Sequence, residues 1–287
     1  MRYTVLLFIA MFAVSCSTLT TKPGTETEGF PVCVQSGSVP VNGAEIYYEI
    51  YGSGDPLILL HGGYSDVHAW RHQIPELAKY FRVIAVDSRG HGASTFDDQP
   101  FTYQLLTADI VDLMDYLKVD RADVVGWSDG AVIALHMGLY HPQRIKRAVL
   151  IGASVQYDNS FTPLDQWVVS HGTLFRLYAD MALSKDFKRR NPHPETWSEF
   201  RDKVYAMWCS ACYLPVKDGE ECVRQLSRIT VPTLMLVGED DMIRREHTEA
   251  IHRAIPSSRL ITIEDADHFV AMQKPSEVNK AILDFLR

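Results

Sequence analysis

Short apolar runs alternate with longer amphipathic segments from about residue 38 to the end of the chain. The runs, such as PLILL and TLMLVG, lack polar alternation, which is typical of strands covered on both faces by helices. Residues 103–117 carry leucine and isoleucine at helical spacing, and Asn42-Gly43 between two early runs indicates a hairpin. This alternation predicts a mostly parallel α/β sheet. The eight strand-like runs cover residues 38–41, 44–51, 56–60, 82–86, 122–126, 148–152, 233–238 and 259–264.

The alternation is interrupted between residues 155 and 228, where aromatic residues are frequent. Trp197, Phe200, Val204 and Trp208 have helical spacing, so most of these rings are expected to form helix core. A helical insertion between two strands lies over the carboxyl ends of the sheet, where ligands bind. We therefore predict a helical cap whose underside shapes a pocket.

The first residues differ from the rest of the chain. A single arginine is followed by the ten-residue apolar run VLLFIAMFAV, which is too short to span a bilayer and is typical of a secretory signal. The stretch AVSC resembles the lipobox of bacterial lipoproteins, although the leucine common three places before the cysteine is Ala13 here. The resemblance implies acylation of Cys16, and Ser17 after it implies export to the outer membrane of a bacterial cell envelope, facing the periplasm. An ordinary cleaved signal and a buried segment are the alternatives.

These features divide the chain into four parts. Residues 1–15 are a signal peptide, residues 16–37 a lipidated N-terminus and flexible tether, residues 155–228 the cap, and residues 38–154 with 229–287 the α/β core.

The charge, the remaining cysteines and two of the histidines argue against nucleic-acid binding, redox catalysis and metal binding. The formal net charge of −8 argues against a nucleic-acid partner, and the basic run at 188–190 is interpreted as a solvated face. In an oxidising compartment a disulfide that includes Cys222 is allowed, and buried free thiols are the alternative. Cys209 and Cys212 form a C-x-x-C without flanking thioredoxin-like elements, so redox catalysis is not expected. His68 and His72 lack an H-E-x-x-H pattern and are expected on a solvated helix face; no metal or organic cofactor is predicted.

The stretch GWSDG places Ser128 between Gly126 and Gly130, after a strand-like run and before a helix-like one. Glycines on both sides remove the β-carbons that would clash at a sharp strand-to-helix turn, so the serine stands exposed at the start of a helix. This is the G-x-S-x-G nucleophile elbow. The pattern also occurs by chance. The strand-like run before it and the helix-like run after it are what indicate a nucleophile elbow here.

A serine nucleophile needs a base and a residue that orients the base. His268 follows the last strand-like run and precedes the final helix. The carboxylate should come between serine and histidine in the chain, after the penultimate strand, where Asp240 and Asp241 are the candidates.

From about residue 38 to its end the chain resembles the α/β-hydrolase superfamily, in the stretches LLHGGYSDVHAW, VIAVDSRGHGAS, VVGWSDGAV, VPTLMLVGEDDMI and DADHFVAMQKPSEVNKAILDFL. The resemblance implies an eight-stranded, mostly parallel sheet flanked by helices. The family's G-x-x-D spacing favours Asp241 over Asp240. By the same resemblance the oxyanion hole consists of the backbone N–H groups of Asp129 and Gly63, with Tyr64 as a second candidate for the latter.

The elbow is similar to that of the valacyclovir-hydrolase (biphenyl-hydrolase-like) branch, which cleaves amino-acid esters. This similarity suggests that the Asp129 carboxylate selects a cationic substrate group, whereas its other interpretation is an acid that complements the helix dipole. Serine rather than aspartate at the elbow disfavours dehalogenases and epoxide hydrolases.

We therefore expect a serine hydrolase that cleaves a small carboxylic ester with Ser128, His268 and Asp241. A lactonase, an amino-acid ester hydrolase or aminopeptidase, a thioesterase, a cofactor-free haloperoxidase and a carbon–carbon bond hydrolase remain open on the same three residues. The alternative from another class is a non-catalytic binding protein on the same scaffold. The expected partners are a small acyl substrate and, through the N-terminal lipid, a membrane.

Overall fold

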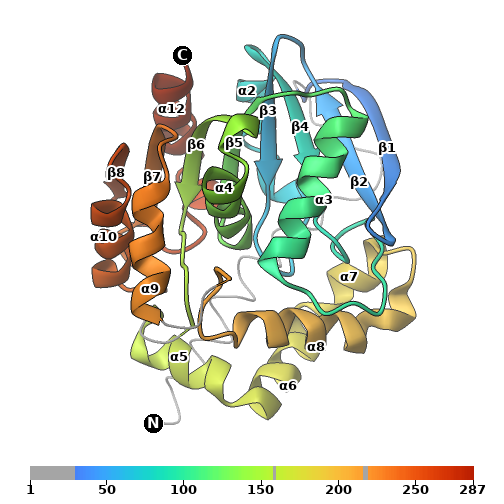
Figure 1. The fold of residues 1–287 in the computed structure, drawn as a ribbon. Helices are drawn as coiled ribbons and strands as arrows, with labels where there is room; N and C mark the ends of the chain where they lie inside the picture. Colours follow the sequence, from blue (N-terminus) through green and yellow to red (C-terminus); the bar gives the residue numbers. More distant parts are fainter. Residues whose placement is uncertain (1–29, 158–159, 216–218) are drawn as a thin grey trace.

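The computed structural model describes residues 30–157, 160–215 and 219–287, and its core is one twisted sheet covered by helices (Figure 1). The eight strands have the spatial order β1-β2-β4-β3-β5-β6-β7-β8. Pairs that involve β2 are antiparallel and all others are parallel, so the predicted fold class is confirmed. The strands are β1 (Cys33–Val41), β2 (Ala44–Tyr51), β3 (Asp55–Leu60), β4 (Phe81–Val86), β5 (Ala122–Trp127), β6 (Ile145–Ile151), β7 (Thr233–Gly238) and β8 (Ser258–Ile263).

The first hairpin forms where Asn42-Gly43 predicts it, because both residues have positive φ angles, of 46° and 84°. One boundary is corrected. Strand β1 begins at Cys33, so residues 33–37 belong to the sheet and not to the tether that the sequence predicts. They pair with the second half of β2, and this extends the hairpin beyond the apolar run that marked it in the sequence.

Helices cover both faces of the sheet and enclose two apolar clusters. One face carries α3 (Tyr103–Tyr116), at the place predicted for it, together with α4 (Asp129–Tyr140) and α10 (Arg245–Ala254). The other face carries η1 (Val67–Trp70), α2 (Ile74–Leu77), α11 (Val270–Gln273) and α12 (Pro275–Leu286). A short turn of 3-10 helix, η2 (Pro142–Arg144), precedes β6.

The segment between β6 and β7, which we call the cap (residues 155–228), contains no strand among its described residues, and Figure 1 shows its helices gathered at one end of the sheet. Trp197, Phe200 and Val204 are buried, as expected of a helix core. The helices are α5 (Pro163–Ser170), α6 (Gly172–Ala182), α7 (Ser184–Arg190), η3 (Pro194–Thr196), α8 (Trp197–Trp208), α9 (Gly219–Arg224) and η4 (Gln225–Arg228).

Cys212 and Cys222 form a disulfide that ties the segment after α8 to α9. Of the two alternatives left open for these cysteines, the structure has the disulfide with Cys222, and the free cysteines of the described residues, Cys33 and Cys209, are exposed. Throughout the described residues, each helix is either too short or too polar to cross a bilayer.

Candidate active site

Ser128 lies at the bend between β5 and α4, in a conformation that side chains rarely adopt, with φ 55° and ψ −117°. The glycines on either side permit this bend. A β-carbon on Gly126 would lie 2.2 Å from the carbonyl oxygen of Gly130, and one on Gly130 would lie 2.0 Å from that of Leu60. The chain therefore packs backbone against backbone here, and the strained turn holds the serine at the first position before a helix.

The three residues predicted as a catalytic triad are joined by hydrogen bonds, although 140 positions separate the first from the last. His268 Nε2 lies 2.9 Å from Ser128 Oγ, and His268 Nδ1 lies 2.8 Å from Asp241 Oδ1. Asp241 also accepts the N–H of Ile243 through the same oxygen. Asp240, the other candidate, is exposed and makes no side-chain contact with the histidine.

An ionised carboxylate only accepts hydrogen bonds, so Asp241 requires the proton of His268 to be on Nδ1. Nε2 is then free to accept the hydroxyl proton of Ser128. Burial by itself lowers the pKa of His268, but the charge of Asp241 and its hydrogen bond outweigh burial, and the net result is a raised pKa. The indole of Trp127 fixes the backbone of the histidine by donating to its carbonyl oxygen at 2.8 Å.

The loop after β3 passes directly beside the serine. A β-carbon on Gly62 would lie 3.0 Å from Ser128 Cβ, and one on Gly63 would lie 2.6 Å from the Asp129 carboxylate. A larger residue at Gly63 would displace the Asp129 and Trp208 side chains, and one at Gly62 would crowd Ser128. Tyr64 has a φ of 54°, and its ring points into the cap against the rings of Phe200 and Trp208.

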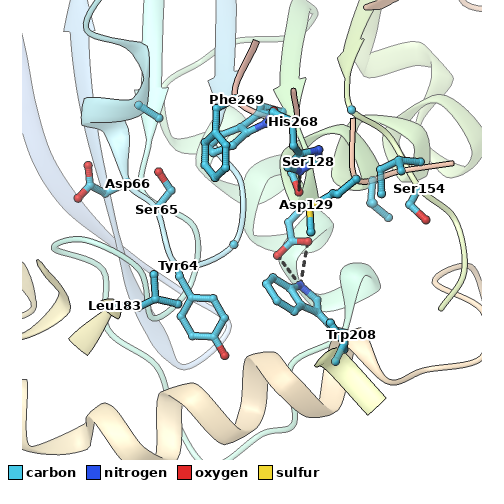
Figure 2. Close-up of a pocket in the computed structure, with 18 of the residues that line it drawn as sticks. Tyr64, Ser65, Asp66, Ser128, Asp129, Ser154, Leu183, Trp208, His268 and Phe269 are labelled. Carbon is cyan, nitrogen blue, oxygen red and sulfur yellow. Dashed lines mark hydrogen bonds between the residues drawn. The ribbon is translucent and has the colours of Figure 1, made fainter. Parts of the chain in front are cut away.

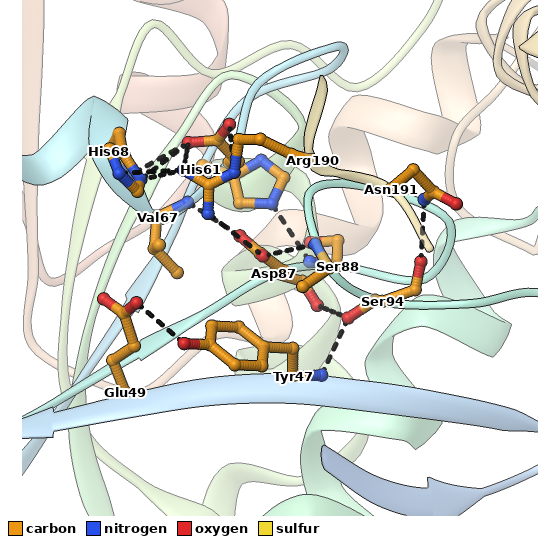
Figure 3. Close-up of polar contacts among 12 residues, drawn as sticks. Tyr47, Glu49, His61, Val67, His68, Asp87, Ser88, Ser94, Arg190 and Asn191 are labelled. Atoms are coloured by element: carbon orange, nitrogen blue, oxygen red, sulfur yellow. Dashed lines mark hydrogen bonds and ion pairs between the residues drawn. The ribbon is translucent and has the colours of Figure 1, made fainter. Parts of the chain in front are cut away.

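A buried polar network holds this loop in place (Figure 3). His61 accepts the Ser88 N–H through Nε2 at 3.0 Å and donates through Nδ1 to the Gly62 carbonyl at 2.7 Å. Burial lowers the pKa of His61 to about 4, which keeps it neutral for both bonds. Asp87 accepts the N–H of Val67 at 2.7 Å.

The cap joins the same network through Arg190, at the end of α7. Its guanidinium lies 3.3 Å from Asp66 and 3.8 Å from Asp87, and it also contacts His68. The prediction of a solvated basic face is therefore wrong for Arg190, which is half-buried, and right for its exposed neighbours Lys188 and Arg189. His68 is exposed as expected, but it lies on the short η1 and not on a regular helix, and His72 lies in the turn after it.

A cavity of about 840 Å³ opens between this loop, the elbow and the cap. Ser128, Asp129 and His268 line it from the core, and the cap contributes an apolar wall (Figure 2). Its size is in the range of sites for small organic molecules. The apolar and aromatic cap residues of the wall are Phe161, Val168, Val169, Phe175, Tyr178, Leu183, Trp208 and Tyr213, and the cap also contributes Asp165, Asp186, Arg189 and Arg190 to the lining.

Asp129 directs its carboxylate towards the cap. Oδ1 accepts the Tyr103 hydroxyl at 2.8 Å, and Trp208 Nε1 lies 3.0 Å from each oxygen (Figure 2). The desolvation of this buried carboxyl raises its pKa, against the opposing effect of the two donors. No Lys or Arg of the described residues lies within ion-pair distance of it. Sequence reasoning missed Trp208 as a cavity residue, because its helical spacing also fits a core position.

The predicted site residues that the structure describes are thus brought together. Ser128, Asp129, Gly63 and His268 all line the cavity, and Asp241 lies behind His268. Cys16 lies outside the described residues. Within the ranges that the structure describes, no group of three or more His, Cys, Asp or Glu side chains could hold a metal ion.

The comparisons with known proteins agree with this geometry. The model of the alpha/beta hydrolase family matches residues 57–281. The serine hydrolase BPHL of Homo sapiens is 28% identical over 267 residues, which cover 90% of this chain and 88% of that protein. The crystal structure of the enol-lactonase from Burkholderia xenovorans LB400 has a TM-score of 0.68 and 26% identity, and the alignment covers 87% of this chain and 99% of that one. Est816, an N-acyl homoserine lactone degrading enzyme, has a TM-score of 0.69 and 27% identity, and the alignment covers 87% of this chain and 100% of that one.

A family match over most of the chain, an elbow serine hydrogen-bonded to a histidine, and an adjoining cavity together identify the protein as an enzyme of the alpha/beta hydrolase family.

Proposed function

We propose that the protein is a serine hydrolase that cleaves a small carboxylic ester through an acyl-enzyme. The observation that carries the proposal is the hydrogen-bonded series Asp241–His268–Ser128, which opens into an apolar cavity. The serine is held in a strained backbone conformation beside an imidazole whose other nitrogen is paired with a carboxylate. This arrangement is the one that nucleophilic acyl transfer needs.

The reaction follows from the positions of these groups. Ser128 Oγ attacks the carbonyl carbon while His268 Nε2 takes the hydroxyl proton, and the resulting imidazolium is stabilised by Asp241. The N–H groups of Gly63 and Asp129 donate to the oxyanion, which is worth about 3–4 kcal/mol per donor in comparable sites. His268 then gives its proton to the departing alkoxide. Water, deprotonated by the same nitrogen, attacks the acyl-enzyme and releases the acid and free Ser128.

The direct test is labelling with a fluorophosphonate, followed by a panel of p-nitrophenyl esters of graded acyl length. We expect an adduct on Ser128 and turnover of the short esters. Ser154 provides the matched control, because it lines the same cavity but directs its hydroxyl to the Gln156 carbonyl and to His247. Folded protein that takes no label at Ser128 would favour the non-catalytic binding protein.

A lactone is the second candidate substrate. Two similar structures, both above 25% identity, are named as an enol-lactonase and as an N-acyl homoserine lactone degrading enzyme. The same three residues would open a cyclic ester, and the leaving alkoxide would stay on the product. Comparing kcat/KM on a lactone and on its open-chain ester decides between the two substrates.

We also propose that Asp129 selects a substrate with a cationic group. Its carboxylate is buried beside the nucleophile, and both of its side-chain hydrogen-bond donors, Tyr103 and Trp208, are neutral. A substrate ammonium would supply the missing positive charge. Asp129→Asn should therefore reduce kcat/KM for an α-amino ester by about tenfold or more relative to its effect on the desamino ester. Equal losses on both esters would contradict the proposal.

Export and acylation at Cys16 remain proposals about residues outside the described part. The Cys212–Cys222 disulfide supports an oxidising compartment, where such bridges persist. Mass spectrometry of the mature protein should find a lipid-modified Cys16 at the N-terminus. An unmodified N-terminus would refute this proposal without affecting the proposed chemistry.

A further inference from the structure

The outer side of the cap exposes large apolar side chains to solvent. Among the described residues ten large hydrophobic side chains are exposed, and five of them lie on the consecutive helices α5 and α6. On α6 these are Leu174, Leu177 and Met181, whose exposed fractions are 45%, 58% and 72%. Their spacing of three and four residues places them on one face of the helix. We call these three residues, with Leu164 and Trp167 of α5, the outer cap face.

This face lies away from the site. On α6 the opposite side carries the buried Phe175 and Ala179, and Phe175 lines the cavity. None of the five residues of the outer cap face lines the cavity. Helix α6 is therefore apolar on both sides, and packing against the cavity explains only its buried side. Exposed apolar groups of this kind mark a surface that contacts another apolar phase or molecule.

The charges next to this face identify the partner. Helix α7 follows α6 after one residue and carries four positive side chains and one negative, although the whole chain has a formal net charge of −8. Arg190 belongs to the network with Asp66 and Asp87, and Arg189 pairs with Asp186, so Lys185 and Lys188 are the basic groups that this surface presents. Lys185, Lys188 and Arg189 are exposed. Here the tryptophan is on α5, the apolar face on α6 and the lysines on α7. A surface with this composition is typical of contact with a lipid interface, where anionic headgroups attract the basic residues.

We propose that the outer cap face docks on the surface of a bilayer that contains anionic lipid, with Leu174, Leu177, Met181 and Trp167 in the interface and the α7 lysines at the headgroups. The docking would turn the cap, and with it the cavity, towards the membrane. The proposal does not depend on acylation of Cys16, because the residues that would contact the bilayer belong to the cap.

Trp167 is a natural reporter for the test. The chain has five tryptophans, and Trp167 is exposed by 45%, whereas the others are buried or half-buried. The full-length protein is bound to phosphatidylethanolamine–phosphatidylglycerol vesicles that contain lipids brominated on the acyl chains. We expect bromine to quench the tryptophan fluorescence, and Trp167→Phe to remove most of the quenching while the protein stays bound. An N-terminal anchor alone would leave the fluorescence unquenched, because residues 1–29 contain no tryptophan.

Two double variants test whether the outer cap face, and not exposed apolar side chains in general, contacts the bilayer. Leu177→Ser/Met181→Ser should reduce the quenching by about fivefold or more, since two apolar groups leave the interface. The matched control Tyr116→Ser/Ile261→Ser removes two exposed apolar side chains elsewhere, with exposed fractions of 59% and 41%, and should leave the quenching unchanged. Both variants should keep the parent turnover of a water-soluble ester, which shows that they fold.

Two results would overturn the proposal. One is vesicle-bound protein whose fluorescence bromine does not quench. The other is a dimer in solution that Leu177→Ser/Met181→Ser dissociates, which would assign the face to a second copy of the chain. Failure of the protein to hydrolyse any ester would refute the proposed function and leave the quenching result unaffected.

Discussion

Replacing Asp241 by asparagine tests how the histidine is activated. Asp241 Oδ1 accepts two hydrogen bonds, from His268 Nδ1 and from the Ile243 N–H, each at 2.8 Å. In Asp241→Asn the amide oxygen must stay at this position, because the amide NH₂ would face the Ile243 N–H donor. His268 therefore keeps its tautomer, and the variant loses the negative charge alone.

The size of the loss follows from this geometry. With 2.8 Å between His268 Nδ1 and Asp241 Oδ1, the centres of the two charges are about 4 Å apart, and at an effective dielectric constant near 20 their attraction is about 4 kcal/mol. That attraction exists only when His268 becomes positive in the transition state. Its loss should lower kcat about a thousandfold, at 1.36 kcal/mol per factor of ten, and change KM little.

Stopped-flow or steady-state hydrolysis of a p-nitrophenyl ester measures this change, and Asp240→Asn is the matched control. Asp240 is exposed, so its replacement should change kcat by less than about twofold. The acid limb of the pH profile should also move to lower pH in Asp241→Asn, because Asp241 is what raises the pKa of His268 against its burial. An Asp241→Asn enzyme with a tenth of the parent kcat, or an acid limb that stays in place, would refute this account of the site.

Three further predictions concern the same region. Ser128→Ala should lower kcat by about six orders of magnitude and abolish fluorophosphonate labelling, while the melting temperature changes little; residual turnover near the parent rate would exclude Ser128 as the nucleophile. In the parent enzyme kcat/KM should fall as the pH drops through the pKa of His268, which lies above its ordinary value of 6.5, because only neutral His268 accepts the serine proton; activity that is constant down to pH values well below about 6 would contradict this. Removing the disulfide with Cys212→Ser/Cys222→Ser opens a link between residues ten positions apart and should lower the free energy of unfolding by about 2–3 kcal/mol in urea denaturation, whereas an unchanged midpoint would show that the bridge contributes nothing.

The parts of the site that lie on local turns could be predicted from the sequence. The bend at Ser128 depends on two glycines within four positions, and the side-chain position of Asp241 depends on a turn that begins at the end of β7. Such short-range geometry is nearly independent of the rest of the fold. The sheet was also predictable from local sequence, because strands that are buried on both faces have continuous apolar runs.

The contacts between cap and core could not be predicted in this way. Trp208 reaches Asp129 across 79 positions, and Arg190 reaches Asp66 across 124. In the sequence, the tryptophan belongs to a helical aromatic stripe and the arginine to a basic run. From these patterns the tryptophan is interpreted as helix core and the arginine as part of a solvated face. Their partners Asp129 and Asp66 are determined by how the cap packs on the core. No local sequence pattern predicts that packing.

Asp129 takes part both in the local turn at the nucleophile and in the contacts between cap and core. Its backbone belongs to the turn, and its side chain to the contacts. Its backbone N–H, at the first position of α4, is the proposed oxyanion donor, and its side chain is held by Tyr103 from the core and by Trp208 from the cap. A shift of α8 would therefore move the carboxylate beside the nucleophile as well as the wall of the cavity. Since a buried carboxylate without donors is costly, the cap and the elbow stabilise each other's position. Cap substitutions that disturb Trp208 should thus affect the chemical step and not substrate binding alone.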